Sequence, residues 1–432
     1  MESFEIIVLV VSFLALVTLG VPIAYSIGLA GVLTMLLSID YLPAVATFAQ
    51  RMATSLDSFT LLAIPLFILA GQLMNNGGIA TRLVEFAKVL VGRLPGGLAI
   101  VNVLANMLFG AISGSAGAAA SAIGSIMHPR MKADGYDENF SAAVNISSAT
   151  TGLVIPPSNI LIVYSLASGG VSIAALFVAG YLPGILMGLA LIIVAGTYAY
   201  RHNYPLGDKV TLGEGFRKFL DALPSLLLLV IVLGGIIAGV FTATEASGVA
   251  VLYCLVLAFL YGEISWRDLP EIMIKTSLTT AIVLLLVATS IGLSWIMAYQ
   301  EIPQSVSAGL LSLSDNPIVI LLLINLVLLF VGVFMDMTPA VLIFTPIFLP
   351  VVTSQLGVDP VHFGIILIAN LCVGLCTPPV GTVLFIGCSV ADVKIQSVVR
   401  PLIPFFLAMI VVLLLITYVP EISLWLPGLF DL

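Results

Sequence analysis

Long apolar runs separated by short polar segments dominate this chain. Runs of membrane-spanning length include residues 4–20, 222–241, 276–296 and 402–419. A helix needs about 20 apolar residues to cross the hydrocarbon core of a bilayer. The pattern therefore predicts an all-α polytopic membrane protein with about ten or more spans.

Two of the apolar stretches are interrupted by paired prolines. The segment 140–164 contains Gly152 and Pro156-Pro157, and the segment 362–388 contains Pro378-Pro379. Proline cannot donate a backbone hydrogen bond, so each pair leaves carbonyl groups without helical partners at membrane depth. Those carbonyls need another partner within the protein. We expect two broken transmembrane helices.

Two further stretches are too long for a single crossing. Residues 96–127 form an apolar run of 32 residues, interrupted by a Ser-Gly-Ser-Ala-Gly sequence that begins at Ser113. A continuous helix of that length would span about 48 Å, which exceeds the hydrocarbon thickness. The run 318–349 is likewise interrupted, at 332–339. Each run is predicted to form a re-entrant helical hairpin that enters and leaves on one side.

The spacing of these features indicates an internal repeat. The two Pro-Pro pairs are separated by 222 residues, because 378 minus 156 is 222. The Gly-x-Asp sequences at Gly135 and Gly357 precede the broken helices and share this offset of 222. One offset for two landmarks predicts two repeats, at 1–200 and 218–432, joined by a cytoplasmic linker at 201–217.

Charge predicts opposite orientations for the two repeats. Basic residues flank the first hairpin, whereas in the second half they follow the broken helix. The residues are Arg82, Arg93, Arg130 and Lys132 in the first half, and Lys394 and Arg400 in the second. Under the positive-inside rule, equivalent loops then lie on opposite sides, and both termini are periplasmic. Inverted repeats with broken helices are typical of secondary transporters.

Composition excludes several classes of protein. With 61% hydrophobic and 8% charged residues, the chain is not a soluble globular protein. It has no basic, aromatic-interleaved surface for nucleic acid, and no P-loop for ATP. Its four cysteines lie within apolar runs and are expected to be buried thiols. An intramembrane enzyme is a weaker alternative because no catalytic motif is present, and a passive channel is weaker because it would not require two inverted, discontinuous ion sites.

The breaks supply oxygen atoms that suit Na⁺. Carbonyl groups of unwound chain and hydroxyl groups can coordinate a monovalent cation in each half. The alternative is that the glycines serve helix packing and the prolines only bend helices. The candidate ligands for two or more Na⁺ sites are Gly110, Ser113, Gly152, Ile155 and Pro157 in the first half, and Gly332, Gly374, Thr377 and Val380 in the second.

Asp336 is the one acidic residue predicted at membrane depth in a hairpin tip. An intramembrane carboxylate is costly and usually functional, although Asp336 could also cap the helix that follows it. An anionic substrate could be held by helix N-termini without a buried arginine. The candidate substrate contacts are Ser115, Thr150, Ser158, Asn159, Asp336, Thr338 and Thr382.

Five short motifs carry a family resemblance. Together they cover both halves, and the sequence resembles the large membrane (M) subunit of the tripartite ATP-independent periplasmic (TRAP) transporters. The motifs are AIPLFILAG from Ala63, FGAISGS from Phe109, IPPS from Ile155, TATEA from Thr242 and TPPVG from Thr377.

The resemblance implies Na⁺-driven import of an organic acid, such as a C4-dicarboxylate or sialic acid, across the bacterial inner membrane. It implies an elevator motion, as in the ion transporter superfamily, a periplasmic binding protein and a small four-helix membrane subunit on a separate chain. Its Na⁺ sites fall on the positions named above, except that Gly110 stands where some members have serine. The alternative is a self-sufficient Na⁺/dicarboxylate symporter of similar fold.

Overall fold

The computed structural model describes residues 2–94, 96–205, 211–430 and 432. Within these residues the chain forms twenty α-helices and two short 3₁₀ helices, with no β-strand. The predicted linker 201–217 includes 206–210, which lie outside the described residues. The all-α prediction is confirmed for the part of the chain that is described.

The helices of the first half run from the N-terminus to Arg201. They are α1 (Glu2–Thr18), α2 (Ile23–Met35), α3 (Tyr41–Ser55), η1 (Phe59–Leu62), α4 (Ala63–Asn76), α5 (Ile79–Val91), α6 (Gly97–Ser113), α7 (Ala116–Ala133), α8 (Glu138–Ala149), η2 (Thr151–Leu153), α9 (Asn159–Ala167) and α10 (Ile173–Arg201).

The helices of the second half begin at Leu212. They are α11 (Leu212–Ile237), α12 (Ala243–Leu260), α13 (Leu269–Tyr299), α14 (Ile302–Leu313), α15 (Pro317–Phe334), α16 (Met337–Ser354), α17 (Pro360–Gly374), α18 (Thr382–Ala391), α19 (Ile395–Tyr418) and α20 (Glu421–Leu429).

Eight of the described helical segments are long and apolar enough to cross a membrane. This is fewer than the ten or more expected from the apolar runs. The difference arises because several apolar runs form shorter helices, including α2, α6 and the two halves of each broken helix. A polytopic membrane protein remains the class that this pattern supports.

Each predicted hairpin is a pair of packed helices joined by a very short turn. Helices α6 and α7 contact each other and are joined at Gly114 and Ser115. Gly114 has φ of +61°, which glycine adopts without the steric cost that a Cβ imposes. The Ser115 hydroxyl accepts a hydrogen bond from the Ala118 amide at 3.2 Å and so caps α7. The turn forms where the sequence predicted the hairpin tip.

Both hairpins extend beyond their predicted ends at 127 and 349. Helix α7 continues through Pro129 to Ala133, and α16 continues through Pro350 to Ser354. The sequence argument ended each hairpin where its apolar run ends. A proline removes a single backbone hydrogen bond, and packing against neighbouring helices can preserve the helix around it.

Both helices with paired prolines are broken. The first is α8, which ends at Ala149, followed by η2, an irregular stretch through Pro156-Pro157, and α9. The second is α17, which ends at Gly374, followed by irregular chain through Pro378-Pro379 and then α18. The breaks stand where they were predicted, although both segments begin slightly earlier and end slightly later than 140–164 and 362–388.

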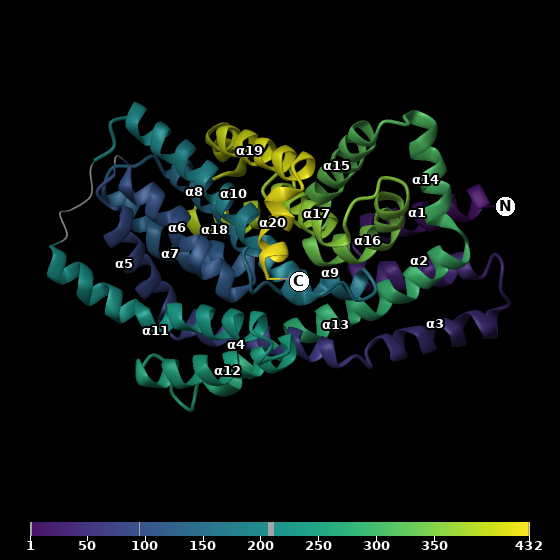
Figure 1. Ribbon diagram of the computed structural model, residues 1–432, viewed down its shortest axis with the longest axis horizontal. Coiled ribbons are helices and arrows are strands. Elements are labelled where there is room, and N and C mark those ends of the chain that lie inside the picture. The colour runs from purple at the N-terminus through teal and green to yellow at the C-terminus, as the bar shows by residue number, and fades with distance from the viewer. Residues whose placement is uncertain (1, 95, 206–210, 431) are drawn as a thin grey trace.

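The helices form two groups, which Figure 1 shows as a lower row and an upper body. Helices α3, α4, α11, α12 and α13 run along the lower side of the view, and α4 packs against α12 and α13. The upper body contains both hairpins and both broken helices. Within it α6 packs on α8 and α15 packs on α17, while α7 contacts α18 and α9 contacts α16. The hairpins and breaks therefore meet at the centre of the molecule.

Candidate functional site

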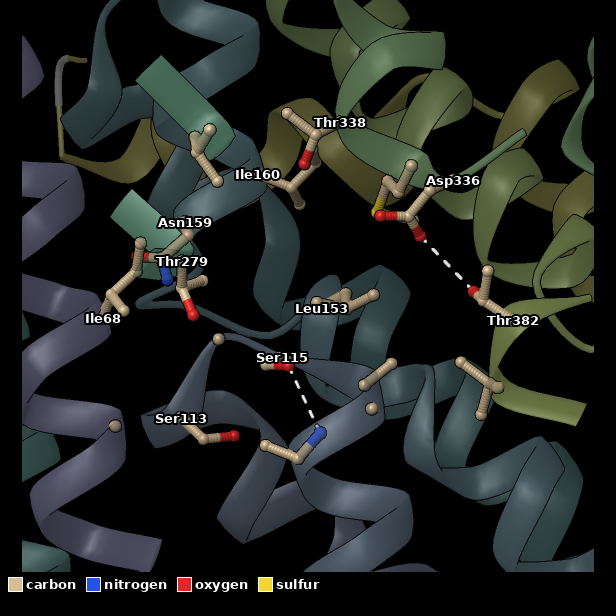
Figure 2. A pocket seen from close by; sticks show the side chains of 18 of the residues that line it. Ile68, Ser113, Ser115, Leu153, Asn159, Ile160, Thr279, Asp336, Thr338 and Thr382 are labelled. Atoms are coloured by element: carbon tan, nitrogen blue, oxygen red, sulfur yellow. Dashed lines mark hydrogen bonds between the residues drawn. The ribbon is translucent and has the colours of Figure 1, made fainter. Parts of the chain in front are cut away.

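A cavity of about 360 Å³ lies where the hairpin tips approach the breaks. The first residues of four helices, α7, α9, α16 and α18, line it on one side, and α4 and α13 line it on the other (Figure 2). Its polar wall consists of Gln72, Asn75, Ser113, Ser115, Asn159, Thr279, Asp336, Thr338 and Thr382. Chain segments far apart in sequence thus meet around one space.

Four helix N-termini point partial positive charge at this cavity, whose one charged lining side chain in the described chain is a carboxylate. Asp336 is the only charged residue in its described lining, which contains no lysine, arginine or histidine. Each of the four helices that begin here has free backbone N–H groups in its first turn and carries partial positive charge at that end. Helix N-termini bind carboxylates and phosphates by these means.

Asp336 occupies the N-cap position of α16 but makes no capping hydrogen bond. Its Oδ1 instead accepts a hydrogen bond from the Thr382 hydroxyl at 3.3 Å, as Figure 2 shows. The carboxylate therefore joins the tip of the second hairpin to the first residue of α18. It faces the cavity rather than the backbone of its own helix.

In the first half the hairpin and the broken helix touch at a pair of glycines. A Cβ added to Gly110 of α6 would lie 2.8 Å from the Cα of Gly152, closer than side chains normally approach. Only glycine at both positions permits this contact of backbone with backbone. Nearby Ser113 is 4% exposed, and its hydroxyl has no hydrogen-bond partner within the described chain. We call this contact the first glycine joint.

The second half repeats the contact at the same offset of 222. A Cβ added to Gly374 of α17 would lie 2.7 Å from the Cα of Gly332 in α15. Gly332 is 222 residues after Gly110, and Gly374 is 222 after Gly152. Thr377 follows this second glycine joint, and its hydroxyl donates to the Val373 carbonyl at 2.8 Å. Both lone pairs of that hydroxyl remain available to a further partner.

Unpaired oxygen atoms beside the first joint could coordinate a monovalent cation. The carbonyl oxygens of Ile155 and Pro157 accept no hydrogen bond from the described chain, and the Ser113 hydroxyl is buried and unpartnered. Unwound carbonyls of this kind coordinate Na⁺ in transporters with broken helices. The described residues contain no group of three or more His, Cys, Asp or Glu that could hold a metal ion.

Comparison with known proteins decides the family. Residues 10–422 match the model of the tripartite ATP-independent periplasmic transporter, DctM component. The chain belongs to this family. The resemblance seen in the sequence is confirmed, and so is the prediction that this TRAP large subunit is a multi-pass membrane transporter rather than an enzyme.

Curated relatives resemble the TRAP large subunit along its whole length. It is 56% identical to the uncharacterized protein YgiK of Salmonella typhimurium, over 99% of this chain and 98% of that protein. It is 39% identical to the C4-dicarboxylate large permease DctM of Pseudomonas aeruginosa, with 93% and 94% covered. It is 38% identical to the sialic acid large permease SiaM of Vibrio cholerae, with 97% of each covered.

A solved transporter shares the fold of this TRAP large subunit. The crystal structure of the YdaH transporter of Alcanivorax borkumensis matches it with a TM-score of 0.64 at 15% identity, covering 91% of this chain and 90% of that one. At this identity the likeness concerns the fold alone.

The structure brings five of the seven candidate substrate contacts of this TRAP large subunit to the cavity wall, and two lie behind it. Thr150 is fully buried, and its hydroxyl donates to the Ser147 carbonyl at 3.1 Å. Ser158 is 1% exposed and its hydroxyl has no partner in the described chain. The five that line the cavity are Ser115, Asn159, Asp336, Thr338 and Thr382.

Four of the nine candidate cation ligands form the two joints, and the other five lie at most five residues from a joint glycine in sequence except Val380, which is six residues from Gly374. The first break is buried from Gly152 through Pro157, whereas in the second break Thr377 is half-buried and Val380 is exposed. The second break is therefore more accessible than the first, although the glycines of both joints are buried.

Sequence reasoning missed the side of the cavity formed by α4 and α13. Gln72, Asn75 and Thr279 line it, yet none had been proposed as a contact. Gln72 and Asn75 are spaced by three residues near the end of an apolar helix, which places them on one helix face. That spacing was the available signal.

Proposed function

We propose that this TRAP large subunit imports a small organic acid anion together with Na⁺ across the bacterial inner membrane. A periplasmic binding protein delivers the substrate, and a small four-helix membrane subunit on a separate chain completes the complex. The observation that carries the proposal is the pair of glycine joints, one per half at an offset of 222, beside a single cavity. Secondary transporters bind ions and substrate where broken helices of two repeats meet.

The repeats are proposed to be inverted about a two-fold axis, and one contact between equivalent residues supports the two-fold relation. A two-fold axis exchanges each residue with its equivalent, so a residue contacts its own equivalent only near the axis. The Cys372 thiol lies 3.3 Å from the Thr150 carbonyl oxygen, and 372 minus 150 is 222. The packing of α7 on α18 and of α9 on α16 is likewise exchanged by this symmetry.

The positions of the basic residues predict which end of the molecule faces the cytoplasm. Arg82, Arg130 and Lys218 cluster near α5 at one end of the molecule, which the positive-inside rule makes cytoplasmic. Both termini are then periplasmic, and both hairpins are re-entrant from opposite sides. The cavity reaches Asn75, at the end of α4 next to α5. In this proposal the cavity therefore extends toward the cytoplasmic end of α4.

In this proposal Na⁺ binds at both joints. The first site takes oxygens from Gly110, Ser113, Gly152, Ile155 and Pro157, and the second from Gly332, Gly374, Thr377 and Val380. The positive charge of the two ions lowers the cost of placing an acid anion in the cavity between them. The four helix N-termini and the hydroxyl groups of the wall then orient the anion.

An elevator motion is proposed for the upper body of helices. Its contact with the lower row is apolar where the first hairpin and the Pro-Pro break meet α4, α11 and α12. The residues there are Phe67, Ala70, Ile112, Pro157, Leu228, Leu229, Val232 and Ala250. This apolar part of the interface can slide without breaking hydrogen bonds or ion pairs.

The proposed substrate is a small carboxylic acid anion. Relatives named for C4-dicarboxylate and for sialic acid are almost equally similar to this chain, so identity does not choose between those two substrates. What the two substrates share is a carboxylate, which the helix N-termini suit.

Reconstitution tests this proposal directly. The complex in proteoliposomes should accumulate substrate under an inward Na⁺ gradient, in the presence of its binding protein. An inward K⁺ gradient, or ATP in place of Na⁺, should produce no accumulation. Full uptake without the binding protein would favour the self-sufficient symporter, and uptake without Na⁺ would contradict the proposal.

A further inference from the structure

Each glycine joint is preceded by a buried hydrogen bond between the same two helices. In the first half the Asn106 amide nitrogen of α6 lies 2.9 Å from the Ser148 hydroxyl and 3.1 Å from Asn145 Oδ1, both on α8. In the second half the Asn370 amide nitrogen of α17 lies 2.7 Å from Asn325 Oδ1 on α15. All five side chains are at most 3% exposed.

The two links share one equivalent position. Ser148 and Asn370 are related by the offset, since 148 plus 222 is 370. Asn106 precedes Gly110 by four residues, and Asn370 precedes Gly374 by four, so each lies one helical turn before a joint glycine. Both halves thus carry a buried asparagine one turn before a joint glycine, although the partner positions differ: Leu328 stands 222 residues after Asn106, and Val103 stands 222 residues before Asn325.

The amide groups extend each link to a third helix. The Asn145 amide nitrogen donates to the Ala120 carbonyl of α7 at 2.8 Å, and the Asn325 amide nitrogen donates to the Thr417 hydroxyl of α19 at 3.1 Å. The oxygens of the Asn106 and Asn370 amides have no partner in the described chain. At a position that served packing alone, an apolar residue would make the protein more stable, because a buried unsatisfied acceptor costs folding free energy.

We propose that Asn106 and Asn370 are positioning residues for the two cation sites. Each fixes the hairpin against the broken helix one turn before the glycine contact, so that the carbonyl oxygens beyond the contact keep the spacing that Na⁺ requires. The inference depends on the proposed function, because it assumes that Na⁺ binds at the joints. It predicts that these asparagines set Na⁺ affinity without touching the ion.

The test is Na⁺-dependent thermal stabilisation of the purified complex, with total Na⁺ plus K⁺ held constant. Asn370→Ala and Asn106→Ala should each raise the half-saturating Na⁺ concentration roughly three- to tenfold, the loss expected from one interhelical hydrogen bond in a membrane protein. Thr34→Val is the control, because the buried Thr34 hydroxyl bonds only to the Ala30 carbonyl of its own helix. It should leave the Na⁺ concentration dependence unchanged.

Double variants separate positioning from general destabilisation. Asn370→Ala combined with Thr377→Ala acts on one joint, so the effects on Na⁺ affinity should be less than multiplicative. Asn106→Ala and Thr377→Ala act on different joints, so their fold-changes in half-saturating Na⁺ concentration should multiply in the double variant. If Asn370→Ala does not fold, Asn370→Ser retains a hydroxyl like that of Ser148 and should show a smaller shift in the same direction.

The outcomes are distinguishable. Asparagine variants that melt earlier in K⁺ but keep the wild-type Na⁺ dependence would overturn the positioning role and leave the proposed function standing. A wild-type complex that Na⁺ does not stabilise relative to K⁺ would overturn both.

Discussion

At the scale of single residues, the positions of the two glycine joints tolerate the fewest substitutions, because only glycine fits there. Gly152 and Gly374 sit where each broken helix meets a hairpin, and a side chain at either would collide with backbone of the facing helix. Backbone cannot rotate away as the end of a flexible side chain can. Small residues at helix contacts are common in membranes, but here the contact also places carbonyl oxygens beside a break.

Gly374→Ala should therefore destabilise the protein by about 1–3 kcal/mol through overpacking and remove its stabilisation by Na⁺. Gly248→Ala in α12 is the matched control, since nothing lies within 4 Å of a Cβ built at Gly248. Thermal unfolding in K⁺ and in Na⁺ measures both effects. If Gly374→Ala and Gly248→Ala had the same melting temperatures in each salt, the second joint would not be tightly packed.

Individual side chains were only partly predictable from the sequence. Asp336 and Ser115 reach the cavity as expected, because each stands at the end of a hairpin arm where the chain turns. Thr150 and Ser158 do not, because the direction of a side chain beside an irregular break depends on how that break folds. Gln72 was missed because an amide near a helix end is usually solvated.

At the scale of elements, helix α5 differs from α14, although both lie between the lower row of helices and a hairpin. Glu85 of α5 accepts hydrogen bonds from Arg130 of α7 at 2.5 Å and from Lys218 of α11 at 2.6 Å. Helix α14 contains no charged residue. The charged links thus hold α5 to both groups of helices at one end of the molecule.

Low pH should weaken the interaction of Glu85 with Arg130 and Lys218. Burial would raise the pKa of the Glu85 carboxyl, but the hydrogen bonds from Lys218 and Arg130 outweigh burial, so the pKa is lowered. A lowered folded-state pKa gives stability that is present above the unfolded pKa and is lost as pH falls through the folded value. Glu85→Gln should therefore cost up to about 1 kcal/mol at neutral pH and progressively less from about pH 5 to pH 3.

Melting temperatures of wild type and Glu85→Gln against pH measure this convergence. Glu271→Gln is the control, because the exposed Glu271–Lys275 pair is an i,i+4 contact within one helix and should contribute little. A constant difference between wild type and Glu85→Gln across the pH range would argue against the ionic link.

Element boundaries show where sequence reasoning succeeded and where it failed. The breaks at Pro156 and Pro378 were located correctly, since adjacent prolines cannot continue a helix. Hairpin ends were placed at about 127 and 349, where the apolar runs end, but the helices continue through Pro129 and Pro350 to Ala133 and Ser354. Adjacent prolines break a helix whatever surrounds them, whereas tertiary packing decides whether a single proline does.

At the scale of the whole molecule, the proposed inversion makes equivalent loops face opposite sides of the membrane. Asp134, after the first hairpin, and Gln355, after the second, are both exposed. Asp134→Cys should react with a membrane-impermeant maleimide only after the cells are permeabilised, and Gln355→Cys should react from outside. The four native cysteines are buried and give little background. Labelling of both positions from one side would contradict the inversion.

The central claim is that each half binds Na⁺ where its hairpin meets its broken helix. The most direct measurement is a pair of experimental density maps of the complex, prepared in Na⁺ and in K⁺ under otherwise identical conditions. The account predicts a density peak beside Gly110 and Gly152 and another beside Gly332 and Gly374 in the Na⁺ map, each surrounded by oxygens and absent in K⁺. Maps without such peaks, or with identical features in both salts, would contradict it.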